Sequence, residues 1–148
     1  MAETLGGLID KLTIKNIRQW HLKNEATKLT ATQINQALKI IRSQINDLTD
    51  EINDFIKNAI KGKVRVREQK LKLYKNPKEE LTLNEIGPLV ALLSRENLYI
   101  WQLEDHVRRE GLPDSEIVKA KRKIDAANQK RNDLIDRIDE LLEKKLKK

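Results

Sequence analysis

A regular run of apolar residues constrains the fold of this chain more than any other feature. From residue 34 to residue 59, apolar side chains recur at alternating steps of four and three: Ile34, Leu38, Ile41, Ile45, Leu48, Ile52, Phe55 and Ala59. Such a seam is typical of a long helix that packs against antiparallel neighbours at small crossing angles. We predict that this helix begins at Thr30 or Thr32 and ends near Gly62.

The chain also contains an internal duplication. Alignment of Trp20 with Trp101 brings five further identical pairs into register: Gly6 with Gly87, Leu8 with Leu89, Leu12 with Leu93, Asn16 with Asn97 and Leu22 with Leu103. The segment Asn-Asp-Leu-x-Asp occurs at residues 46–50 and again at residues 132–136. Each half therefore predicts one αα-hairpin. Because neither hairpin buries its apolar face alone, we predict an all-α fold, an antiparallel four-helix bundle built from two duplicated hairpins.

The length of 148 residues fits one helical domain, since domains usually have about 100–150 residues. We place the first copy at 5–61, the crossover at 62–84 and the second copy at 85–147. The first helix is expected at 5–28 with Thr4 as its cap, and the third at 88–109. A capping-box pattern, Thr82 to Glu85, precedes the third helix, and Asp114 or Ser115 is expected to start the fourth.

The crossover has a different pattern from the helices. Apolar and polar residues alternate between 63 and 76, which predicts extended chain or a short β-ribbon. Nine Lys or Arg residues stand against one Glu between 57 and 78, within a chain of net charge +7. The crossover cations are candidate nucleic-acid contacts: Lys63, Arg65, Arg67, Lys70, Lys72 and Lys75. A solvated, lysine-protected edge is the alternative interpretation.

Composition excludes several classes of protein. Without cysteine the chain has no disulfide, no thiolate zinc site and no cysteine nucleophile, which fits a reducing compartment. No apolar run approaches the ~20 residues of a membrane span. The first residues include Glu3 and Asp10 and lack the basic segment of a signal peptide. We expect a cytoplasmic protein.

One polar group in the second copy is a candidate ligand site. The duplication aligns the seam residue Ile45 with Arg131, so a charge falls at a core position and needs a carboxylate partner, for which Glu104 and Asp105 are candidates. The candidate ligand-binding residues are Asn97, Trp101, Glu104, Asp105, Asn128, Arg131, Asn132 and Asp133. The alternative is a structural polar network that fixes the register of the helices.

Other polar and aromatic residues favour structural roles. We expect Trp20 and Trp101 to lie in the core, and the aspartate pairs at 47/50 and 133/136 to be solvated. Neither histidine belongs to the Glu-x-x-His motif of di-iron bundles, so we predict no metal and no cofactor. No catalytic set stands out.

Two segments resemble a known family. They are Asn97-x-x-x-Trp101-x-x-Glu104-Asp105 and the run from Lys121 to Ile135, which reads Lys-Arg-x-Ile-Asp-x-x-Asn-Gln-x-Arg-Asn-Asp-Leu-Ile. They are similar to small, mostly bacterial helical proteins catalogued only as a domain of unknown function. The resemblance marks these residues as a family signature and implies no activity.

These observations leave three hypotheses about function. The first is a non-enzymatic interaction or scaffold protein that associates with itself or with another protein, since the seam is regular and no catalytic set is present. The second is a small-ligand binder or enzyme acting on a phosphorylated or sugar substrate at the polar group around Arg131. The third is nucleic-acid binding through the basic crossover.

Overall fold

The computed structural model of the chain describes residues 3–25, 28–67 and 83–147. The described residues form four helices: α1 (Leu5–Asn24), α2 (Ala31–Ile60), α3 (Ile86–Val107) and α4 (Asp114–Leu146). The predicted all-α class is therefore confirmed for the residues that the structure describes. Among the described residues there is no β-strand.

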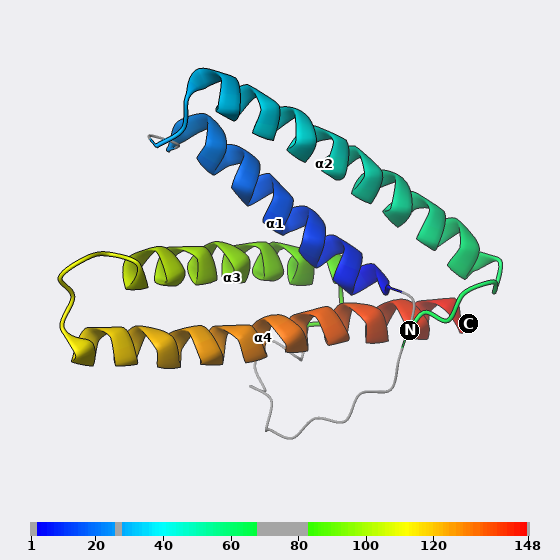
Figure 1. Cartoon of the computed structure of the whole chain (residues 1–148). Coiled ribbons are helices and arrows are strands. Elements are labelled where there is room, and N and C mark those ends of the chain that lie inside the picture. The colour runs from blue at the N-terminus through cyan, green and yellow to red at the C-terminus, as the bar shows by residue number, and fades with distance from the viewer. Residues whose placement is uncertain (1–2, 26–27, 68–82, 148) are drawn as a thin grey trace. The chain divides into compact units, whose positions relative to one another are not determined.

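The helices form two compact units, residues 1–66 and 67–148. Figure 1 shows α1 beside α2 in the first unit and α3 beside α4 in the second, and the contacts between helices follow the same pairing. Each unit is a helical hairpin in which the second helix is longer than the first. The predicted first copy thus lies in one unit and the predicted second copy in the other.

The first hairpin has well-defined helix ends. The Thr4 side chain accepts a hydrogen bond from the Gly7 amide at 3.2 Å, which confirms the predicted cap. Thr30 and Gln33 form a reciprocal capping box at the start of α2. After α2, Gly62 adopts a positive φ of 70° and the Lys63 amide bonds to the Asn58 carbonyl. This is the glycine-dependent helix end that the sequence indicated.

One of the two helix starts in the second hairpin differs from the prediction. The cap of α3 is Glu85, without a side-chain hydrogen bond to the helix, so the predicted capping box does not begin this helix. Thr82 itself lies outside the described residues. The fourth helix begins at Asp114, as predicted, and the residue before it, Pro113, is its cap. Its fixed φ already suits the entry to a helix, so Asp114 becomes the first helical residue and places its charge where the helix dipole favours it.

The described start of the crossover contains no strand, so the predicted β-ribbon is not supported. Residues 63–67 are irregular, and the remainder of the predicted ribbon, 68–76, lies outside the described residues. The physical reason is local: the Lys63 amide completes the end of α2 instead of pairing with another strand.

The two hairpins differ in how completely they bury their apolar residues. The apolar side chains that are almost fully enclosed, Leu89, Leu93, Leu134 and Ile138, all belong to the second hairpin. In the first hairpin, α1 buries Leu5 and Leu8 near its start, whereas Leu12, Ile14 and Ile17 are only half-buried. Trp20 is 54% exposed, so the expectation that both tryptophans are core residues is wrong for Trp20. Trp101 is half-buried.

Candidate functional site

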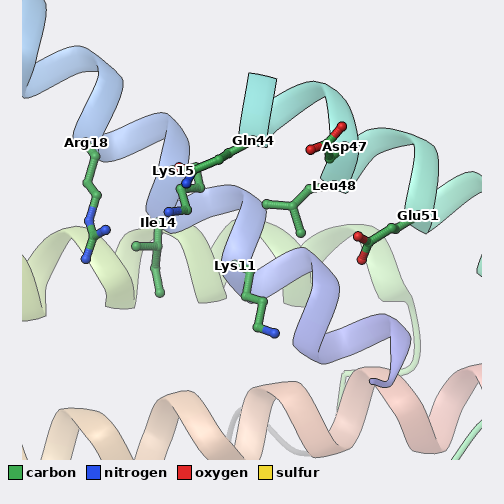
Figure 2. Close-up of a pocket in the computed structure, with 8 residues that line it drawn as sticks. All are labelled: Lys11, Ile14, Lys15, Arg18, Gln44, Asp47, Leu48 and Glu51. Carbon is green, nitrogen blue, oxygen red and sulfur yellow. The ribbon is translucent and has the colours of Figure 1, made fainter. Parts of the chain in front are cut away.

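The first hairpin contains a groove of about 460 Å³ between α1 and α2. Its lining residues, drawn in Figure 2, are Lys11, Ile14, Lys15 and Arg18 from α1 and Gln44, Asp47, Leu48 and Glu51 from α2. Ile14 and Leu48 supply the apolar part of the lining. This groove was not predicted from the sequence, because its two walls come together only when the hairpin closes.

The charged and polar residues of the groove occur in pairs, one from each helix, at the same height along the helix axes. We call each such height a level. Along α1 the cations occur at 11, 15 and 18, and along α2 the facing polar residues occur at 51, 47 and 44, with the same steps in the opposite direction. Antiparallel helices therefore place Lys15 at the level of Asp47, and Lys11 at the level of Glu51. In Figure 2 the labelled residues follow this order along both helices. The groove has a cationic wall on α1 and a mainly acidic wall on α2.

The charges of the two walls are only partly neutralised. Lys11 donates a hydrogen bond to Glu3, which raises the pKa of Lys11, and the nearby charge of Glu51 acts in the same direction. In the described part of the chain, Lys15 and Arg18 form no ion pair with Asp47 or Glu51. The middle of the groove thus presents charges of both signs to the solvent.

The second hairpin places the predicted ligand residues in three different environments. Asn97 and Asp133 are buried, with exposed fractions of 4% and 2%. Three predicted residues are half-buried: Trp101, Asn128 and Arg131. Three others are exposed: Glu104, Asp105 and Asn132. Asn97, Trp101 and Asp105 follow one another at four-residue steps along α3. Exposure increases along this row, from the buried Asn97 to the exposed Asp105.

Arg131 occupies the seam position that the duplication predicted. It follows Ala127 by four residues and precedes Leu134 by three, and both of these neighbours are buried. The predicted carboxylate partner is missing, because Glu104 and Asp105 lie at exposed positions and Arg131 makes no ion pair among the described residues. Its Nε is enclosed and has no hydrogen-bond partner. The half-buried side chain keeps part of its surface in water, which lowers the cost of leaving the charge unpaired.

A second set of buried charges lies on α4, and Asp133 is the only one of them that the sequence analysis placed at the candidate ligand site. Asp133, Asp136 and Asp139 are all buried, so the expectation that the pair at 133/136 is solvated is wrong. Asp136 lies 3.9 Å from Arg67 of the crossover, and on α3 the buried Glu96 lies 3.4 Å from Lys130. The burial of these aspartates could have been predicted from their spacing, because they recur every three residues between apolar residues of the same helix. The corresponding pair of the first copy, Asp47 and Asp50, is exposed as expected.

Near its end, α4 carries a smaller ion-pair network around Glu140. Oε1 of Glu140 lies 3.1 Å from both Arg137 and Lys144. Burial raises the pKa of Glu140, but the hydrogen bond from Lys144 and the charges of Arg137 and Lys144 outweigh burial and lower it overall. These ion pairs stabilise the folded helix, and we assign them a structural role.

The candidate nucleic-acid residues are only partly described. Lys63 and Arg65 are exposed, and Arg67 is half-buried beside Asp136. Lys70, Lys72 and Lys75 lie outside the described residues. Among the residues that the structure describes, no three His, Asp or Glu side chains are grouped so that they could hold a metal ion. No described helix is both long and apolar enough to cross a membrane.

Comparison with protein families places both hairpins in one family. The model of the family described as protein of unknown function (DUF4254) matches residues 1–67 and 88–148. The chain belongs to the DUF4254 family. The gap in the match nearly coincides with the crossover, so what defines DUF4254 in this chain is the pair of hairpins. No curated protein and no solved structure matches the chain.

Proposed function

We propose that this DUF4254 protein is a non-enzymatic helical interaction protein that associates with itself. The observation that carries the proposal is the incomplete burial of the first hairpin. Ile14 in the open groove is only half-buried, as are Leu12 and Ile17 on the same helix. Covering apolar surface contributes about 25 cal/mol per Å². A partner that covers this helix therefore gains free energy that the isolated hairpin leaves unused.

We propose further that the two hairpins of one chain pack into a four-helix bundle. At 100° per residue, Ile9 and Trp20 lie on the side of α1 opposite to Lys11 and Arg18 of the groove. The incompletely buried apolar residues of α1 therefore lie on more than one side of the helix, and the groove is only one of these sides.

Unfolding followed at each tryptophan tests the bundle. Each hairpin contains one of the two tryptophans, so the variants Trp20→Phe and Trp101→Phe each retain one fluorescent reporter. Urea transitions with the same midpoint are expected, because one bundle unfolds as a unit. Two separate midpoints, after correction for the effect of each substitution on stability, would contradict the bundle.

The oligomeric state in solution tests self-association. Sedimentation velocity from low to high micromolar concentration is expected to show a species larger than the monomer. Ile14→Ser should weaken association at least tenfold, because it places a hydroxyl on the apolar part of the groove. The matched control is Val118→Ser, a change of similar chemistry at an exposed position of α4, which should leave association unchanged. A wild-type protein that stays monomeric throughout would refute the proposal.

Arg131 favours a second candidate function, the binding of a small phosphorylated or sugar ligand in the second hairpin. The observation is its enclosed Nε without a hydrogen-bond partner, close in sequence to Asn128 and the buried Asp133. A phosphorylated sugar at a hundred times its dissociation constant would stabilise the fold by about 2.7 kcal/mol. The thermal shift should be lost in Arg131→Met and kept in Arg122→Met, an exposed arginine of the same helix. Equal shifts in both variants would reject this candidate.

A further inference from the structure

We infer that the groove of the first hairpin is the surface on which a second copy of this chain docks, in one specific orientation. The inference rests on the self-association proposed above and names its geometry. Two hairpins meet face to face about a twofold axis parallel to their helices. In this arrangement α1 of each copy lies over α2 of the other.

The first argument is that the groove carries both positive and negative charges. One wall carries Lys11, Lys15 and Arg18, and the opposite wall carries Asp47 and Glu51. A surface that carries both signs in separate rows is complementary to itself, which is the requirement for an isologous interface. A purely anionic partner such as nucleic acid would be repelled by the acidic wall.

The second argument selects the direction of the axis. Rotation about an axis parallel to the helices exchanges the two walls and keeps each level in place. Lys15 of one copy then faces Asp47 of the other, and this contact occurs twice in the dimer. Rotation about an axis that crosses the helices within the same face would instead set the cationic walls against each other, which like-charge repulsion disfavours.

The third argument concerns the groups that are left to form these contacts. In the described part of the chain, Lys15 and Asp47 form no ion pair although they lie at the same level of one groove. Between the charged rows, Ile14 is half-buried and offers apolar surface for the partner to cover. The neighbouring Leu48 is already buried, so its side chain gives the contact a packed base.

A charge-exchange experiment in trans tests the orientation. Lys15→Glu and Asp47→Lys are prepared as separate proteins and studied by sedimentation velocity, alone and as an equimolar mixture. Each variant alone should associate at least tenfold more weakly than the wild type, because its homodimer opposes like charges twice. In the mixture the two substituted side chains attract each other, and the two native side chains do the same. A heterodimer of near wild-type affinity is expected.

Control variants separate an interface effect from a general charge effect. Lys121→Glu and Asp125→Lys reverse two exposed charges of α4 and should leave association unchanged. Circular dichroism and thermal unfolding establish that every variant is folded. Damage to the fold of one chain cannot be repaired by mixing, so recovery in the mixture reports a contact between chains.

Each result has a defined consequence. If the wild type associates but the mixture remains as weak as its components, or if both variants associate like the wild type, the proposed orientation is wrong and self-association itself stands. The second of these outcomes would leave the groove, with a volume suited to a small molecule, free for another occupant. A monomeric wild type would remove both the inference and the function on which it rests.

Discussion

Arg137 donates a hydrogen bond of 3.1 Å from Nη2 to Oδ1 of Asn84. One residue earlier on α4, Asp136 lies 3.9 Å from Nε of Arg67. Arg67 and Asn84 both belong to the crossover, residues 62–84. These two crossover residues therefore contact α4 at neighbouring positions. This turn of α4 fixes where the chain enters the second hairpin.

Loss of the Arg137 side chain should destabilise the second hairpin. Arg137→Met removes the contact with Asn84 and the ion pair with Glu140, while the side chain is only 10% exposed. The free energy of unfolding should fall by about 1–2 kcal/mol, as measured by urea denaturation. Arg122→Met, at an exposed position of α4, should change it by less than about 0.5 kcal/mol. Equal stability of the two variants would refute the role of Arg137.

The stabilising contribution of Glu140 should disappear in acid. Its pKa is lowered in the folded state, so the contribution is complete above the unfolded-state pKa of about 4.3 and is lost as pH falls through the folded value. At neutral pH the wild type should therefore melt at a higher temperature than Glu140→Gln. The difference should shrink as pH falls below about 4.3. A difference that stays constant down to the lowest pH studied would show that ionisation of Glu140 is not its source.

Equivalent leucines of the two copies should differ in the effect of truncation. Leu93 is 0% exposed, and its duplicate Leu12 is half-buried. Leu93→Ala should cost about 2–5 kcal/mol of unfolding free energy, because it leaves a cavity in a closed core. Leu12→Ala should cost less than about 2 kcal/mol, since it removes less buried surface. Urea denaturation of the two variants measures both effects, and equal losses would mean that the two hairpins are equally well packed.

Gly62 should respond to alanine through its backbone conformation. It has a positive φ of 70°, and apart from its chain neighbours no atom lies within 4 Å of an added Cβ. Gly62→Ala should therefore cost about 1 kcal/mol of unfolding free energy through backbone strain alone. Gly62→Asn should cost less, because asparagine adopts the left-handed region more readily than alanine does. Urea denaturation measures both losses, and equal losses would contradict backbone strain as the cause.

Local sequence patterns were sufficient to predict the four helices and their pairing into hairpins. The four–three seam, the duplication and the residues Thr4, Thr30 and Gly62 depend on local periodicity and local hydrogen bonds, which the chain encodes wherever it lies. Both hairpins follow from these features. The position of Arg131 on the seam of α4 also followed, because a duplication transfers register directly from one copy to the other.

Which copy of each repeated residue is buried depends on tertiary contacts and could not be predicted from the sequence. Asn97 is buried and Asn16 is exposed; Asp133 is buried and Asp47 is exposed on a groove wall. Burial depends on what covers a residue from outside its own helix, and a repeated sequence carries no record of that difference. The groove escaped prediction for the same reason. Its opposed charges come from positions about thirty residues or more apart, and they face each other only in the closed hairpin.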